Sequence, residues 1–357
     1  MPTNVTAEYR KAEQAFREAR EPRERLQCLK EMLRTIPKHK GTEHVQADIK
    51  RRIKQLTEQV VGGKKGGGRT APVYSVPPAG AAQIALVGPP NAGKSSLHAR
   101  LTRSHSEVGA YPYTTRAPVP GMLAYEDIQF QLVDLPPISE AFMEPWFGNA
   151  LERTDAALLI VDVSEAACVD QIEVIRVRLG EKKIALQEAW PGLPGATNGA
   201  ANGAREDVRE GARKEQEDEL EDPFRIELPT LLVANKSDLD PDPDEVKVLE
   251  ELLGVAYPAV ATSATTGEGV DRIGELLFEG LEIVRVYTKT PNEAADMDEP
   301  FTVRRGQTVI DVARLVHRDI AAKLRFARVW GSGVFDGQQV GPDHEVADGD
   351  IVELHTQ

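Results

Sequence analysis

The stretch GPPNAGKS, residues 88–95, decides the fold of this chain. It is a complete G-x-x-x-x-G-K-S loop. The apolar run before it, 82–87, is typical of a buried strand, and the segment after it, 96–101, is typical of a helix start. The glycines let successive backbone N–H groups cradle phosphate oxygens, and the helix N-terminus adds its positive dipole. The pattern predicts a site for a nucleoside triphosphate; the alternative is a chance glycine turn before a helix.

The residue types in this loop predict its chemistry. The Lys94 ammonium can reach the β- and γ-phosphates, and the Ser95 hydroxyl can ligate Mg²⁺. We therefore expect Lys94 to act in catalysis and Ser95 to hold the metal. The residues expected to bind the nucleotide here are Gly88, Pro89, Asn91, Ala92, Gly93, Lys94, Ser95 and Ser96.

A second motif predicts which base is bound. The apolar run 231–234 ends in the tetrapeptide NKSD, residues 235–238. Guanine presents two adjacent donors, N1–H and the N2 amine, and the two oxygens of the Asp238 carboxylate can accept from both. Adenine has no such pair and would leave the carboxylate unmatched. We expect Asn235 to tie this loop to the phosphate loop and the stem of Lys236 to lie along the base.

A third apolar run supports the same base. The run AVATSA, residues 259–264, ends in Ser263 and Ala264, and the backbone N–H of Ala264 is expected to meet guanine O6. All three motifs follow apolar runs, and ligands bind at the carboxyl ends of the strands in open α/β sheets. Their order along the chain predicts GTP or GDP as the ligand.

Two further segments predict a magnesium site and a switch. The run FQLVD, residues 130–134, is typical of a strand that ends in an acid, and Asp134 is expected to hold Mg²⁺ through water. Between it and the phosphate loop lies AYPYTTR, residues 110–116. One of Thr114 and Thr115 is expected to close on Mg²⁺ and the γ-phosphate; the alternative is an ordinary β-prone pair. The candidate metal ligands are Ser95, Thr115 and Asp134, and the candidate catalytic residues are Lys94 and Thr115.

These motifs resemble the G domain of the Obg and developmentally regulated GTP-binding protein group. The YPYTT segment, 111–115, is characteristic of that group. The resemblance covers most of residues 80–357 and implies GTP binding with Mg²⁺, slow hydrolysis, and association with the ribosome (its large subunit) or structured RNA. An activating protein partner is a further expectation. The C-terminal part resembles the TGS domain, a small β-grasp module, through FTVRRGQTV (301–309), VHRDI (316–320), ARVWG (327–331) and VGPDHEVADGD (340–350).

The chain departs from this family pattern directly after Asp134. The usual Asp-x-x-Gly is Asp134-Leu135-Pro136-Pro137 here, and proline has no N–H to contact the γ-phosphate. Ile138 follows, where some GTPases carry a glutamine that orients the attacking water. We therefore expect hydrolysis to be slow, or to use another group.

Asn91 offers such another group. In related GTPases with the sequence Pro-Asn-x-Gly-Lys-Ser, the asparagine is associated with activation by potassium, so K⁺ is a candidate cofactor. The alternative is a residue that only shapes the loop, because asparagine tolerates unusual φ angles. Hydrolysis rates measured in potassium and in sodium separate the two.

The expected order of domains is a basic helical hairpin at 1–61, a Gly/Pro-rich linker at 62–80, an α/β P-loop G domain at 81–290 and an α+β TGS domain at 298–357. The G domain should contain a mostly parallel sheet with helices on both faces. Residues 190–226 are rich in Gly, Ala, Asn, Glu and Asp, which predicts a disordered acidic insertion. A solvated loop is favoured there over an acidic partner site.

The N-terminal segment has a helical and basic pattern. An apolar stripe runs from Leu26 to Leu33 at amphipathic spacing. Cations crowd a turn at 38–40 and the next helix at 50–54. Against a formal net charge of −14 for the chain, this concentration favours an arm that contacts rRNA phosphates; the alternative is a solvated coiled-coil face.

Composition predicts a cytoplasmic protein that does not associate with membranes. The chain has 357 residues and only two cysteines, far apart, which excludes a disulfide framework and favours a reducing compartment. The N-terminus lacks the basic start and apolar core of a signal peptide, and no apolar run is long enough to span a bilayer.

The favoured function is therefore a GTPase whose nucleotide state controls its binding to the ribosome or structured RNA. Two rivals belong to other classes. A binding-only nucleotide switch is motivated by Pro137 and Ile138, and measured turnover tests it. A protein-assembly adaptor would dock through the helical hairpin, and ribosome co-sedimentation tests it.

Overall fold

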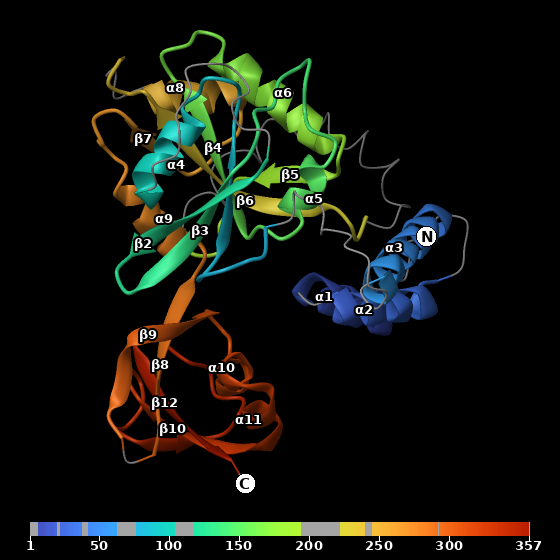
Figure 1. Ribbon diagram of the computed structural model, residues 1–357, viewed down its shortest axis with the longest axis vertical. Helices are drawn as coiled ribbons and strands as arrows, with labels where there is room; N and C mark the ends of the chain where they lie inside the picture. Colours follow the sequence, from blue (N-terminus) through green and yellow to red (C-terminus); the bar gives the residue numbers. More distant parts are fainter. Residues whose placement is uncertain are drawn as a thin grey trace, which may run out of the picture. The chain divides into compact units, whose positions relative to one another are not determined.

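The computed structural model describes residues 6–19, 22–37, 42–62, 76–103, 117–193, 222–239, 245–291 and 293–356. The chain divides into two compact units, shown in Figure 1. The first, called here the N-terminal unit, contains 1–72 and 198–226, and the second contains 73–197 and 227–357. None of the helices formed by the described residues is long and apolar enough to cross a membrane.

In the N-terminal unit the described residues form three helices, where the sequence predicted a hairpin. They are α1 (Ala7–Glu18), α2 (Pro22–Thr35) and α3 (Glu43–Gly62). The Thr6 hydroxyl caps α1 by accepting from the backbone N–H of Tyr9 at 3.2 Å. Neighbouring helices pack in sequence order, and Leu29 and Met32 from the predicted apolar stripe are fully buried. The basic turn at 38–40 lies outside the described residues.

Both ends of the predicted disordered insertion belong to folded structure. Trp190 is only 3% exposed, and its indole N–H donates to the carbonyl of Thr230 at 3.0 Å. Phe224 packs edge-on against Phe16 in the helical core, and the guanidinium of Arg52 lies over the Phe224 ring, 4.3 Å from its centroid. The prediction was wrong at these ends because average composition hides single aromatic residues that anchor a segment. Residues 194–221 lie outside the described residues.

The second unit begins with the G domain, whose seven-stranded sheet has the order β2-β3-β1-β4-β6-β5, with β7 beside β6. β1 runs parallel to β3 and β4, and β6 runs parallel to β4 and β7, while β2 pairs antiparallel with β3. The strands are β1 (Gln83–Val87), β2 (Val119–Tyr125), β3 (Ile128–Asp134), β4 (Ala156–Asp162), β5 (Ile184–Gln187), β6 (Ile226–Asn235) and β7 (Ala259–Thr262).

Both faces of this sheet are covered. Every residue of β1 and β4 is buried, as expected of parallel strands between helix layers. Ile84 and Leu86 join a core with Leu97 and Ile273, while Ala85 points to the opposite face because strand side chains alternate. The sequence prediction of a mostly parallel sheet with helices on both faces is confirmed. The helices are α4 (Lys94–Thr102), α5 (Phe147–Leu151), α6 (Cys168–Gly180), α8 (Glu245–Leu253) and α9 (Arg272–Gly280).

The C-terminal domain is a five-stranded sheet of order β11-β10-β12-β8-β9, packed against α10 and α11. Its first strand, β8, pairs with β9 and β12, so this domain begins near Ile283 and the predicted boundary at 290–298 is wrong. The alternating pattern of β8 predicts a strand but not which sheet it joins. The elements are β8 (Ile283–Lys289), β9 (Ala295–Arg304), α10 (Val309–Val316), α11 (Arg318–Lys323), β10 (Leu324–Trp330), β11 (Gln338–Val340) and β12 (Asp350–Thr356).

Arg285 joins the two domains of the second unit. Arg285 on β8 contacts Glu126 and Asp127, which form the turn between β2 and β3, and also pairs with Asp348 at 2.7 Å. Tyr287 donates to Asp127 from the same strand. Burial raises the pKa of Asp127, but hydrogen bonds from Tyr287 and Arg285 outweigh it and hold that pKa below its ordinary value. This group, the Arg285 junction, fixes the β2–β3 turn against the C-terminal domain.

Candidate functional site

The phosphate loop follows β1 at the carboxyl edge of the sheet, where strand order turns from β3 on one side to β4 on the other. Gly93 has φ of 89° and Asn91 has φ of 64°, both in the left-handed region. A Cβ on Gly88 would overlap the carbonyl oxygen of Ile160, so only glycine fits between the loop and β4. α4 begins at Lys94 directly after the loop, so its N-terminus faces the space that the loop encloses.

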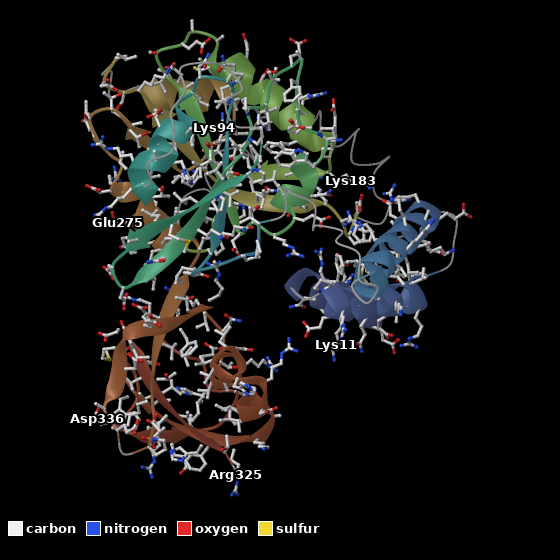
Figure 2. The ribbon with its side chains drawn as sticks, in the orientation of Figure 1. Lys11, Lys94, Lys183, Glu275, Arg325 and Asp336 are labelled. Atoms are coloured by element: carbon white, nitrogen blue, oxygen red, sulfur yellow. The ribbon has the colours of Figure 1, made fainter. Side chains whose placement is uncertain are left out.

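Lys94 lies folded against the loop, and Figure 2 labels it. Its ammonium donates to the carbonyls of Gly88 and Pro89 at 3.1 and 2.8 Å. The side chain is 7% exposed. Burial lowers the pKa of Lys94 to about 8, against the charge of Asp134, which raises it. A polyphosphate bound in the loop would add negative charge beside this buried ammonium.

Ser95 and Asp134 meet as the sequence predicted for a metal site. The Ser95 hydroxyl donates to Asp134 Oδ2 at 2.6 Å, and Asp134 is buried at the end of β3. A hydroxyl and a carboxylate oxygen beside a phosphate loop fit Mg²⁺, which takes hard oxygen ligands and keeps several waters. Thr114 and Thr115, the predicted switch and third metal ligand, lie outside the described residues, as does all of 104–116.

Asn235 ties the base motif to the phosphate loop, as the sequence predicted. Its side-chain Nδ2 donates to the carbonyl of Ala92 at 2.9 Å. Its Oδ1 accepts from the backbone N–H of Ala264 at 3.1 Å and from the Thr262 hydroxyl at 3.4 Å. A Cβ on Gly93 would overlap the same amide nitrogen of Asn235. One buried amide therefore joins all three predicted loops.

The residues predicted to bind the base follow β6 and β7. Asp238 is exposed at the turn after β6, so its carboxylate can accept from a base that enters from solvent. The Lys236 ammonium pairs with Asp162 Oδ2 at 2.5 Å, which holds its stem in place. Ser263 and Ala264 follow β7, but the Ala264 N–H is turned toward Asn235. Its predicted contact with guanine O6 stays a prediction.

Asp162 and Arg100, which lie outside the predicted set of site residues, hold the loops of this site in place. Asp162 ends β4, and the signal for it was an acid at the carboxyl end of a buried strand beside β1. Burial raises the pKa of Asp162, but hydrogen bonds from Lys236 and Ser164 outweigh it and leave that pKa lowered. Arg100 on α4 reaches the loop after β7, and nothing in the linear motifs marks it.

The segment after Asp134 is apolar and buried. Pro136, Pro137 and Ile138 are all buried, and the backbone N–H of Ile138 donates to the carbonyl of Gly88 at 3.1 Å. Because both prolines lack an N–H, the first amide available after Leu135 is already used on the phosphate loop. This geometry agrees with the predicted loss of a γ-phosphate contact at Pro137.

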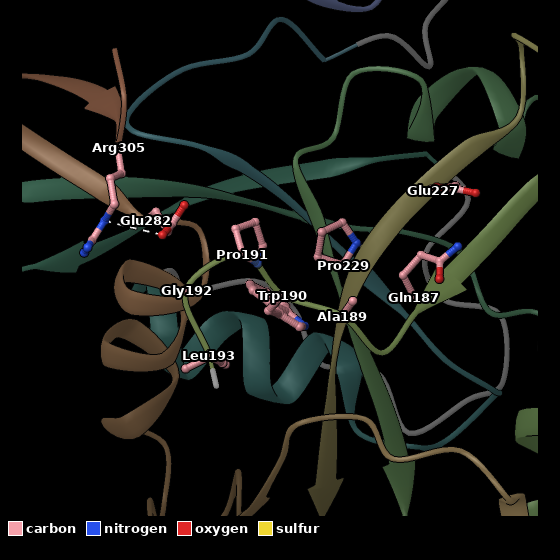
Figure 3. A pocket seen from close by; sticks show the side chains of 10 residues that line it. All are labelled: Gln187, Ala189, Trp190, Pro191, Gly192, Leu193, Glu227, Pro229, Glu282 and Arg305. Carbon is pink, nitrogen blue, oxygen red and sulfur yellow. Dashed lines mark ion pairs between the residues drawn. The ribbon is translucent and has the colours of Figure 1, made fainter. Parts of the chain in front are cut away.

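The second unit also contains a pocket of about 730 Å³, whose lining side chains Figure 3 shows. It is lined by Trp190 and its neighbours, by Glu227 and Pro229 near the start of β6, and by the ion pair of Glu282 with Arg305. The nucleotide motifs follow the opposite ends of their strands. None of the predicted nucleotide-binding residues lines this pocket.

Comparison with known proteins agrees with this architecture. Residues 83–187 match the family model described as 50S ribosome-binding GTPase, and 284–356 match the TGS domain model. An uncharacterized GTP-binding protein of Methanocaldococcus jannaschii is 31% identical over 367 residues, covering 93% of this chain and 92% of the relative. Developmentally-regulated GTP-binding protein 1 of Xenopus laevis is 27% identical over 360 residues, covering 91% and 96%.

Among solved structures, a GTP-binding protein from Pyrococcus horikoshii covers 77% of this chain and 100% of its own, with 19% identity and a TM-score of 0.48. The sequence relatives align along nearly the whole chain, and the two matched domains occur in the expected order. The chain therefore belongs to the family of developmentally regulated GTP-binding proteins, in which a P-loop G domain is followed by a TGS domain.

Proposed function

We propose that this chain is a cytoplasmic GTPase that turns over slowly and binds the ribosome, at its large subunit, or structured RNA in a GTP-dependent manner. The observation that carries the nucleotide part is the Asn235 amide, which holds the phosphate loop and both base loops together. The description of the matched family, a 50S ribosome-binding GTPase, supports the choice of partner.

In the proposed complex the described residues contact different parts of the nucleotide. Lys94 leaves the carbonyls of Gly88 and Pro89 for the β- and γ-phosphates, and the first turn of α4, with Ser96, offers its backbone N–H groups. Ser95 and Asp134 hold Mg²⁺, with Thr115 closing from the switch. Asp238 pairs with guanine, Lys236 lies along its face, and Ser263 and Ala264 border O6.

Slow hydrolysis follows from the segment after Asp134. Neither proline offers an N–H to the γ-phosphate, and the Ile138 side chain cannot orient water. A partner on the ribosome, or an activating protein, would supply the missing group. K⁺ held near Asn91 is a second candidate, because its positive charge would lie beside the phosphates. The left-handed φ of 64° at Asn91 equally fits a loop-shaping role. Equal hydrolysis rates in potassium and sodium would remove K⁺ from the proposal.

The RNA contact is proposed for one face of α3. Lys50, Arg51 and Lys54 are exposed there, and Arg51 pairs with Asp48 at 2.7 Å. Arg52 instead packs over the Phe224 ring and has a structural role. Phosphate contacts by exposed cations weaken steeply with salt, so binding through this face should be salt-sensitive.

The Arg285 junction supports a route from nucleotide state to the TGS domain. The β2–β3 hairpin starts just after the proposed switch and ends at Asp134, and its turn is held by Arg285. A change at either end of this hairpin would act on the TGS domain through Arg285. The C-terminal domain would then present a different surface to the ribosome in each state.

Ribosome co-sedimentation in sucrose gradients tests the proposal. With a non-hydrolysable GTP analogue we expect the protein in the large-subunit or ribosome fractions, and with GDP we expect it at the top. The triple reversal Lys50→Glu, Arg51→Glu, Lys54→Glu should abolish co-sedimentation. As a control, Arg10→Glu, Lys11→Glu, Lys30→Glu changes the same number of charges at exposed positions of α1 and α2.

Two outcomes would contradict the proposal. Equal distribution with both nucleotides would remove GTP dependence, and full binding by the α3 reversal would remove the RNA argument. Arg285→Ala should bind GDP normally and lose the difference between nucleotide states. Arg314→Ala, which breaks an exposed ion pair with Asp311 inside the C-terminal domain, should keep that difference.

A binding-only switch is the second candidate, favoured by the two prolines and the use of the Ile138 amide on Gly88. It predicts the same GTP-dependent sedimentation with hydrolysis at the uncatalysed rate. Turnover measured with ribosomes present separates the two.

A further inference from the structure

Arg100 reaches from the phosphate-binding helix to the loop that follows β7. Its Nη1 donates to the carbonyls of Ala264 and Thr265 at 3.2 and 3.1 Å, and its Nη2 donates to the carbonyl of Thr266 at 2.9 Å. Three consecutive carbonyls therefore converge on one guanidinium. An exposed arginine usually gains little from such hydrogen bonds, because water can bond to the guanidinium and to the carbonyls equally well.

The loop is shaped to receive this side chain. Gly267 has φ of 94°, and a Cβ there would overlap Nη2 of Arg100, so the guanidinium lies directly against the glycine backbone. The Gly267 N–H donates to the Ser263 carbonyl at 2.8 Å, and the Thr266 N–H donates to the Ser263 hydroxyl at 3.0 Å. The loop thus closes on itself around Arg100.

Because each peptide group is planar, holding these carbonyls also orients the backbone N–H groups that follow them. Each carbonyl lies in one rigid plane with the N–H of the following residue. Fixing the carbonyls of residues 264–266 therefore fixes the N–H groups of residues 265–267. The Ala264 amide at the start of the loop is fixed separately, by Asn235. A planar fork with several donors can hold three acceptors at once, and a lysine ammonium on a flexible stem holds them less well.

We propose that Arg100 is a positioning residue for guanine recognition. It holds the loop 263–267 so that the backbone N–H of Thr265 meets the O6 edge of the base. Among the described residues the other amides of this loop already donate to Asn235, to Glu268 or to Ser263. Because Lys94 and Ser95 lie at the other end of the same helix, Arg100 also keeps the base loop in register with the phosphate site. This inference rests on the assignment of that loop to guanine in the proposed function.

The test measures binding of three diphosphates by calorimetry in the presence of Mg²⁺. GDP carries every recognition group. IDP lacks the N2 amine, which would donate a hydrogen bond to Asp238. In 6-thio-GDP sulfur, a larger atom and a weaker acceptor, replaces O6. The variants are Arg100→Ala and Arg100→Lys. Arg103→Ala is the control, since it removes the same charge from the end of the same helix. Among the described residues, the Arg103 guanidinium makes no hydrogen bond or ion pair.

We expect Arg100→Ala to bind GDP about tenfold more weakly, the cost of about one charge-assisted hydrogen bond. The ratio of its affinities for GDP and 6-thio-GDP should fall toward one, because a loosened loop neither donates well to oxygen nor excludes sulfur. Its preference for GDP over IDP should stay as in the wild type. Arg100→Lys should fall between, and Arg103→Ala should match the wild type.

Equal weakening of all three nucleotides in Arg100→Ala would overturn the proposal, because a merely structural role predicts that result. If Arg100→Ala does not fold, Arg100→Lys carries the comparison, and wild-type behaviour of that variant overturns the proposal as well. A wild type that does not distinguish GDP from 6-thio-GDP would overturn it together with the base assignment. Ribosome association is judged separately by sedimentation.

Discussion

The two sides of the nucleotide site are built in different ways. On the base and α-phosphate side, called here the binding half, buried polar side chains bridge separate loops, with Asn235 joined to Ala92 and Ala264. On the γ-phosphate side, called here the switch half, residues 135–138 are apolar and attach to the phosphate loop through the Ile138 amide. This chain can hold a nucleotide through one set of contacts, while its described segment 135–138 lacks the N–H that an Asp-x-x-Gly sequence would offer to the last phosphate.

Gly93→Ala should give the largest effect, because it damages the binding half at its centre. The new Cβ would meet the Asn235 amide and force a φ that favours glycine. With both the loop and its anchor displaced, we expect GDP affinity to fall about a hundredfold or more, measured by calorimetry.

Gly180→Ala is the matched control for that change. It lies at the end of α6, nothing lies within 4 Å of a Cβ built there, and its φ is not in the left-handed region. Its GDP affinity should equal that of the wild type. An unchanged affinity in Gly93→Ala would show that the loop and Asn235 move independently.

Asp238→Asn should change which base the binding half prefers. An amide offers one donor and one acceptor in place of two acceptors, which suits the C2 carbonyl of xanthine better than the guanine amine. We expect the ratio of GDP to XDP affinity to fall about a hundredfold, since an unmatched polar group at a recognition site is costly. Competition between the two diphosphates measures the ratio, and an unaltered ratio would take Asp238 out of base recognition.

Pro137→Gly should make the switch half distinguish GTP from GDP more strongly, because it adds an N–H at a position where proline has none. A hydrogen bond to a charged phosphate is worth about 1.5–3 kcal/mol, so preference for a GTP analogue over GDP should rise about tenfold. Pro136→Gly adds equal backbone freedom one residue earlier and serves as the control. A similar gain in both variants would assign the effect to flexibility.

The smallest effect concerns the Lys94 proton. Its pKa of about 8 applies without nucleotide, and bound phosphates would raise it. Binding should therefore take up about half a proton per nucleotide at pH 8, and more at pH 8.5. Calorimetry in buffers with different ionisation enthalpies measures this uptake. No uptake at pH 8 would mean that Lys94 is already charged in the free protein.

The binding half could be predicted from the sequence because its motifs are local. Residues 88–95 and 235–238 each follow a buried strand, and parallel strands bring their carboxyl ends to one edge. The bond from Asn235 to Ala92 spans 143 positions and still followed from that rule.

Other features depend on tertiary contacts that no local pattern encodes. Arg100 and Asp162 are ordinary residues in sequence and gain their roles only where α4 meets the loop after β7 and where β4 lies beside β6. Phe224 lies in a polar stretch and packs against helices far away in sequence. The assignment of β8 to the TGS sheet likewise depended on its partners, β9 and β12.

Single-turnover hydrolysis of pre-bound GTP by the purified protein, without a partner, tests most directly whether binding and γ-phosphate sensing are separate here. With both prolines in place and no water-orienting side chain at Ile138, we predict tight GTP binding and a rate on the order of 10⁻³ s⁻¹ or slower, comparable to GTPases that lack their activator. A rate of about 1 s⁻¹ or faster under these conditions would contradict the account.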